Sequence, residues 1–142
     1  MPGRPLELLL VDDNEDDLLL MQEALAGHPA IGSARVANGG AAAFAILRAE
    51  PPWRPHLIIL DLNMPILDGF GVLRALKEDP ALRGIPVLVV TASGREADVT
   101  RAYDAGAATY FQKPLHHPEL INLVAALDRY WAGAALLPGK PK

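Results

Sequence analysis

Short apolar runs that stop abruptly at polar residues recur along the chain, and they predict buried strands. The runs at residues 7–11, 57–60 and 87–90 are nearly continuous in apolar side chains, which is typical of strands covered on both faces of a parallel sheet. Two weaker segments, residues 33–37 and 109–111, predict shorter strands of edge character. Five strands are therefore expected.

Segments with helical spacing separate these runs. The first predicted helix covers residues 18–25 and ends before Pro29, and Leu19 falls on its outer side. A helix at residues 96–105 and a last helix that opens near Pro118 are also expected. The side chains predicted to face the core are, helix by helix, Leu20, Met21, Ala24 and Leu25; Phe44 and Leu47; Val72, Leu73 and Leu76; and Leu120, Leu123, Val124, Leu127 and Trp131.

Strands and helices alternate five times, which predicts an α/β fold with helices on both faces of a parallel sheet. The doubly wound, flavodoxin-like arrangement with strand order 2-1-3-4-5 is the expected topology, and it places a ligand site at the carboxyl ends of the strands. The chain of 142 residues suits one domain. We expect its core at about residues 6–131 and a C-terminal extension at 132–142.

Composition excludes several classes of protein. The chain is 51% hydrophobic and 21% charged, carries a net charge of −4 and contains no cysteine. The mild acidity gives no basic surface for nucleic acid and no polybasic membrane anchor. The absence of cysteine excludes disulfides, zinc–thiolate sites and thiol catalysis. No apolar run reaches membrane length, and we expect a cytoplasmic protein.

Residues able to handle a phosphoryl group follow four of the five strands. Asp12 and Asp13 follow the first, Asp61 the third, Thr91 the fourth and Lys113 the fifth, so the predicted topology gathers them at one rim. Clustered carboxylates repel each other, and an all-oxygen ligand set favours a hard cation, Mg²⁺ above all. A carboxylate nucleophile with a metal, an ammonium and a hydroxyl suits phosphoryl transfer.

Four short motifs at this rim carry a resemblance to a known family. They are VDDN at residues 11–14, DLNMPILDG at 61–69, TAS at 91–93 and YFQKP at 110–114. Together and in this order they resemble the receiver domain of two-component response regulators, of the stand-alone kind similar to the chemotaxis regulator. The resemblance covers nearly the whole chain.

This resemblance implies roles for the acidic residues and the lysine. Asp61 looks like the phosphoacceptor, Asp13 like a direct Mg²⁺ ligand and Asp12 like a ligand through water. The backbone carbonyl of Asn63 would be the remaining protein contact to the metal. Lys113 is similar to the family's phosphate-pairing lysine. A sensor histidine kinase would then be the phosphoryl donor.

The resemblance also implies a switch and a control on phosphate lifetime. Thr91 and Tyr110 look like the pair in which the hydroxyl moves toward the phosphoryl group and the aromatic ring swings inward. Asn63 and Ser93 look like the positions that tune hydrolysis, and we expect moderate autodephosphorylation. The bond between Lys113 and Pro114 is expected to be cis, which is rare even before proline.

Interaction surfaces are expected at two places. Leu19 is either a scattered surface residue or, together with Leu18 and as in the family, part of the contact with the kinase's dimerisation bundle. The apolar tail from Trp131 onward suggests a homodimer formed through the last two helices and this tail. The opening sequence, the proline-rich loop before the third strand and the extension resemble stand-alone regulators paired with bacterial phytochrome kinases.

The function expected from these residues is a single-domain response regulator. It would be a signalling protein rather than an enzyme, promoting only its own phosphorylation and dephosphorylation. A constitutive interaction module with a receiver fold and a phosphate sink for a kinase are the alternatives. A flavin binder needs a phosphate cradle after the first strand, where this chain has acids, and an aspartate-nucleophile phosphatase would carry an Asp-x-Asp pattern there.

Overall fold

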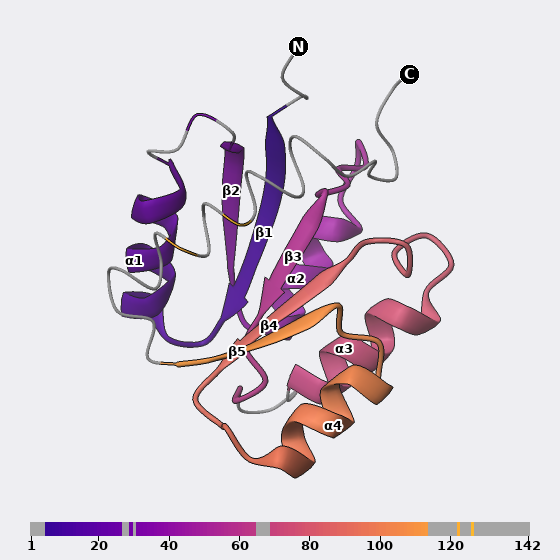
Figure 1. The fold of residues 1–142 in the computed structure, drawn as a ribbon. Coiled ribbons are helices and arrows are strands. Elements are labelled where there is room, and N and C mark those ends of the chain that lie inside the picture. The colour runs from indigo at the N-terminus through magenta and orange to yellow at the C-terminus, as the bar shows by residue number, and fades with distance from the viewer. Residues whose placement is uncertain are drawn as a thin grey trace.

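A computed structural model describes residues 5–26, 29, 31–64 and 69–113, together with the single positions 122 and 126. It contains a five-stranded parallel sheet with helices on both faces (Figure 1). The order of the strands is β2-β1-β3-β4-β5. The elements are β1 Leu6–Asp12, α1 Glu15–Ala26, β2 Ile31–Asn38, α2 Gly40–Leu47, β3 Leu57–Leu60, α3 Gly69–Glu78, β4 Val87–Thr91, α4 Glu96–Asp104 and β5 Thr109–Gln112. The predicted α/β class and strand order are confirmed.

The sheet separates the described core into two layers. Side chains alternate between the two faces of a strand, so Leu8 and Leu10 of β1 pack with α1 while Leu9 and Val11 pack on the opposite face. That opposite face is covered by α2, α3 and α4. The three central strands β1, β3 and β4 are buried on both faces, whereas β2 and β5 are only partly buried. This contrast explains why the central runs are apolar throughout.

The inward face of α1 differs from the prediction. Leu18, Met21 and Leu25 are buried. Leu20, which was predicted to face the core, is 48% exposed, and its neighbour Leu19 is 56% exposed. The helix begins at Glu15, three residues before the predicted start. Three consecutive leucines fit two helical phases equally well, and the sheet selects the phase that buries Leu18.

The other described helices follow their predicted faces. Phe44 and Leu47 of α2 are buried, as are the three predicted core residues of α3. Of the predicted last helix, only Asn122 and Ala126 lie within the described residues, and both are helical and exposed. The tail beyond Trp131 lies outside the described residues, so its packing and the boundary of the predicted extension stay predictions.

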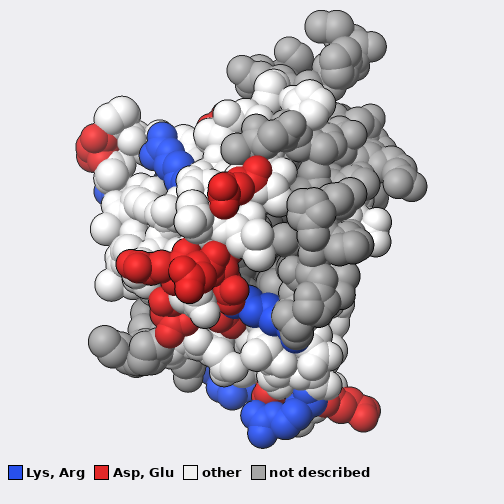
Figure 2. Space-filling model, turned by 90° about the vertical axis from the view of Figure 1, so that its left-hand side faces the viewer, with Lys and Arg blue, Asp and Glu red and all other residues white. Residues whose placement is uncertain are grey.

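Surface features of the described residues are modest. Figure 2 shows acidic side chains gathered on one face of the molecule. The first turn of α1 contains three acidic residues, Glu15, Asp16 and Asp17. Within the described ranges, no helix combines the length and the apolar character that crossing a membrane requires.

Gly69 joins the start of α3 to the end of β3. Its N–H donates to the Leu62 carbonyl at 2.9 Å. A Cβ at this position would overlap the Leu62 Cα and the Asp61 carbonyl oxygen. This close approach therefore requires glycine.

We expect Gly69→Ala to lower the free energy of unfolding by about 3 kcal/mol, because backbone atoms must move to admit the methyl group. Urea denaturation of the purified variant measures this loss. Gly84→Ala is the matched control, since a Cβ at Gly84 meets no atom within 4 Å. Equal stability of the two variants would contradict the argument.

Candidate functional site

The carboxyl ends of four strands meet at one rim of the sheet. Asp12 ends β1, Asp61 directly follows β3, Thr91 ends β4 and Lys113 directly follows β5. Backbone pairing sets their positions, because Asp61 N–H donates to the Val11 carbonyl at 2.9 Å and Lys113 N–H donates to the Thr91 carbonyl at 2.6 Å. The sheet register thus brings together side chains that lie up to 101 residues apart in the sequence.

Asp12 and Asp61 are held in the same manner. Each has its Oδ1 bound by the backbone N–H two residues later, Asn14 or Asn63, at 3.0 Å. Each has its Oδ2 bound by Lys113 Nζ, at 2.5 Å for Asp12 and 3.2 Å for Asp61. Both residues are buried, at 6% and 5% exposure. Two local turns and the ammonium of Lys113, which is distant only in the sequence, therefore fix the orientation of both carboxylates.

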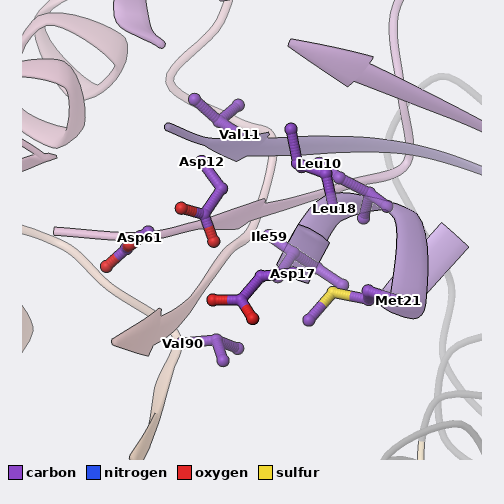
Figure 3. Close-up of a pocket in the computed structure, with 9 residues that line it drawn as sticks. All are labelled: Leu10, Val11, Asp12, Asp17, Leu18, Met21, Ile59, Asp61 and Val90. Atoms are coloured by element: carbon purple, nitrogen blue, oxygen red, sulfur yellow. The ribbon is translucent and has the colours of Figure 1, made fainter. Parts of the chain in front are cut away.

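A third carboxylate contacts the same ammonium. Asp17 Oδ2 lies 2.9 Å from Lys113 Nζ, and Figure 3 shows the Asp12, Asp17 and Asp61 side chains around one space. Sequence reasoning did not identify Asp17. The available signal was its place in the first turn of α1, which it shares with Glu15 and Asp16, so nothing local distinguished it.

Burial and charge act against each other at this rim. Burial raises the pKa of Asp12 to about 6, with Asp61 adding to the rise and the hydrogen bonds from Lys113 and Asn14 opposing it. Burial alone would lower the pKa of Lys113, but the carboxylates of Asp12 and Asp17 outweigh it and raise that pKa above its usual value. The lysine therefore remains charged at physiological pH and acts as the counter-ion of the acidic residues.

Three of the acidic residues can hold a cation together. Asp12, Asp13 and Asp61 each offer a carboxylate oxygen, and these oxygens lie within 4.8 Å of one another. The set consists of oxygen ligands only and includes the exposed carboxylate of Asp13, which suits a hard divalent cation that keeps part of its water shell. The residues present therefore fit such an ion. Contact through the Asn63 carbonyl stays a prediction.

Thr91, the last residue of β4, carries a buried hydroxyl. The residue is fully buried, and within the part of the chain that the structure describes its Oγ1 has no hydrogen-bond partner. A buried hydroxyl without a partner costs free energy. An acceptor brought within hydrogen-bond distance of Oγ1 would relieve that cost.

Tyr110 and Ser93 connect β5 with the loop after β4. The Tyr110 hydroxyl donates to the Ser93 carbonyl at 2.7 Å, and the Ser93 hydroxyl donates to Asp98 Oδ2 at 2.5 Å. Asp98 also accepts two hydrogen bonds from the Arg95 guanidinium. The Ser93 side chain is thus held by the first turn of α4, and Tyr110 is tied to the same loop through its hydroxyl.

The remaining predicted site residues differ in accessibility. Asn63 is exposed and Ser93 is half-buried. Their shared role in tuning hydrolysis stays a prediction. Leu18 of α1 packs in the core, so Leu19 is the exposed member of the predicted docking pair. Leu20, which was not part of that pair, is exposed as well. Pro114 lies outside the described residues, so the cis bond after Lys113 stays a prediction.

Comparison with known proteins identifies the family. Residues 8–125 match the family described as response regulator receiver domain. Response regulator Rcp1 of Synechocystis sp. is 35% identical over 138 residues, which cover 94% of each chain.

Two solved structures are similar along nearly the whole chain. The phosphorylated cyanobacterial phytochrome response regulator RcpA has a TM-score of 0.84 and 37% identity, covering 95% of this chain and 99% of its own. The Mn²⁺-bound form of Rcp1 has a TM-score of 0.79 and 35% identity, covering 95% and 100%. The chain therefore belongs to the response regulator receiver domain family, whose members act in phosphorylation-dependent two-component signalling.

We expect Thr91→Val to raise the free energy of unfolding of the unphosphorylated protein by about 1 kcal/mol, because a methyl group replaces a buried hydroxyl that lacks a partner. Chemical denaturation measures the difference. Thr91→Ser is the control, since it keeps the hydroxyl and loses the methyl group, and it should be less stable than wild type. A valine variant less stable than wild type would show that the hydroxyl is satisfied.

Proposed function

Proceeding from membership of the receiver family, we propose that Asp61 accepts a phosphoryl group from a histidine kinase in a Mg²⁺-dependent reaction. The observation that carries this proposal is the position of Asp61. Its carboxylate lies 3.2 Å from Lys113 Nζ and shares the cation-binding set with Asp12 and Asp13. A nucleophile, an ammonium and a metal-ligating set are the components that phosphoryl transfer requires.

The chemistry follows from what each group can do. An Asp61 oxygen attacks phosphorus while the bond from phosphorus to the donor's imidazole nitrogen breaks, which leaves an acyl phosphate on the protein. Asp12, Asp13 and Asp61 would hold Mg²⁺, which would supply positive charge against the oxygens of the transferred group. Lys113 pairs with a phosphoryl oxygen. The protein modifies only itself, so it acts as a signalling protein and not as a turnover enzyme.

Thr91 and Tyr110 form the proposed switch. The unpartnered Thr91 hydroxyl donates to the phosphoryl group, and Tyr110 exchanges its hydrogen bond to Ser93 for a more buried position. Asn63 and Ser93 set the approach of hydrolytic water and give a moderate phosphate lifetime. The hydrogen bond from the Ser93 hydroxyl to Asp98 supports a role for α4 in holding that side chain.

Partners are proposed from the surface and from the relatives. The exposed side chains of Leu19 and Leu20 on α1 form an apolar contact for the kinase. Leu18 is buried and supports this contact from within the core. The similarity to RcpA, a cyanobacterial phytochrome response regulator, supports a bacterial phytochrome kinase as the donor. We also propose a cytoplasmic homodimer formed through the last two helices and the tail, without nucleic-acid binding.

Two alternative functions, a constitutive interaction module and a phosphate sink, would respond differently to phosphorylation. A constitutive interaction module would bind its partner without any response to phosphorylation. A phosphate sink would accept the group and lose it without engaging a downstream partner. The partly buried acidic rim and the unpartnered Thr91 hydroxyl favour a phosphorylated switch over the module, because both are costly features that a purely structural surface does not need.

We expect one added phosphoryl mass on the wild-type protein after incubation with acetyl phosphate and Mg²⁺, as measured by intact-protein mass spectrometry. Asp61→Asn should show no adduct, because the amide cannot serve as the nucleophile, and EDTA should abolish the adduct on wild type.

Asp16→Asn is the matched control and should be phosphorylated like wild type, since Asp16 is exposed and outside the acidic rim. Retention of the adduct by Asp61→Asn would move the acceptor elsewhere. A wild-type protein without any adduct would favour the interaction module.

A further inference from the structure

We propose that Asp17 is a positioning residue for Lys113 and that, through this lysine, it raises the affinity of the acidic rim for divalent cations. The inference rests on the proposed function, because it concerns the same metal-dependent site. Lys113 Nζ contacts three carboxylates, at 2.5 Å for Asp12, 2.9 Å for Asp17 and 3.2 Å for Asp61. Asp17 has the second shortest of these contacts.

Asp17 differs from the other two partners in one respect. Asp12 and Asp61 belong to the cation-binding set, which they complete with Asp13. Asp17 contacts the ammonium but lies outside that set. When a cation occupies Asp12 and Asp61, the lysine loses part of their negative charge, and Asp17 is the partner left to hold it.

The first turn of α1 fixes Asp17 for this role. The Asp17 backbone N–H donates to the Asn14 side-chain oxygen at 3.0 Å, and the Asp17 side chain reaches the space that Asp12 and Asp61 also line (Figure 3). Its side chain is 40% exposed, compared with 9% and 6% for Asp12 and Asp61. Placing its carboxylate there therefore costs less desolvation free energy than at Asp12 or Asp61.

Asp17 affects the competition between Lys113 and a cation for the same carboxylate oxygen atoms. Without Asp17, the Lys113 ammonium would depend on Asp12 and Asp61 alone and would compete more strongly with an incoming cation for their Oδ2 atoms. With Asp17 present, part of the lysine's charge is satisfied from the α1 side. Asp17 thus makes the carboxylate oxygens of Asp12 and Asp61 easier for a cation to take.

A simpler explanation must be separated from this one. Asp17 also adds one negative charge near the cation, and that direct attraction alone would favour metal binding. The two explanations differ in their dependence on Lys113. Direct attraction persists when the lysine is removed, whereas action through the lysine disappears with it.

The test is Mn²⁺ binding by isothermal titration calorimetry on the full chain, with Asp17→Asn and Asp16→Asn made in wild type and in Lys113→Met. In wild type we expect Asp17→Asn to raise the dissociation constant by about threefold to tenfold, as for residues coupled within one ion-pair network. Asp16→Asn removes the same charge from an exposed neighbour and should change it by less than about twofold. In the Lys113→Met background, Asp17→Asn should have no larger effect than Asp16→Asn.

Each other outcome overturns the inference. An equal effect of Asp17→Asn in both backgrounds would assign Asp17 to direct attraction only, and no effect in wild type would remove its role. Asp17→Glu, which keeps the charge, should bind Mn²⁺ close to wild type and guards against misfolding of the asparagine variant. If wild type and Asp16→Asn both fail to bind Mn²⁺, the proposed metal-dependent function fails together with this inference.

Discussion

The arrangement of the Lys113 ammonium among three carboxylates is the interaction on which the rim of this protein depends. Two unit charges of like sign about 4 Å apart cost about 4 kcal/mol at an effective dielectric constant near 20, so the acidic residues need a counter-ion in every state. Lys113 lies at the end of the edge strand β5 and contacts Asp12 at the end of the central strand β1. One ion pair therefore connects parts of the sheet that no backbone hydrogen bond joins.

The parallel sheet makes this arrangement possible. Its central strands are buried on both faces, so apart from Glu7 near the start of β1 their polar residues lie where the strands end. With β1 and β3 adjacent at the point where strand order reverses, Asp12 and Asp61 meet there, and this is where α/β sheets bind ligands. Gly69 then allows α3 to start directly against the backbone after Asp61. The strand pairing and the backbone approach at Gly69 therefore form the fold and position the site at the same time.

Much of this could be predicted from the sequence because it depends on strong local patterns. Continuous apolar runs identified the central strands, and the residue that stopped each run identified the rim. The inward face of α1 was wrong at Leu20, since consecutive leucines do not specify a helical phase. Asp17 was missed because it lies in a helix rather than at the end of a strand, and nothing in the first turn of α1 distinguishes it from Glu15 and Asp16. The hydrogen bond from Ser93 to Asp98 likewise depends on how α4 begins, which no motif records.

If Lys113 is the counter-ion that stabilises the metal-free rim, its removal should destabilise the protein most when no cation is present. Urea denaturation of wild type and Lys113→Met at pH 8 in EDTA, repeated with excess Mg²⁺, measures this. We expect the variant to lose about 3 kcal/mol of unfolding free energy in EDTA, the cost of breaking a buried ion pair, and to regain more stability than wild type when Mg²⁺ is added. A variant as stable as wild type in EDTA would show that Lys113 does not act as this counter-ion.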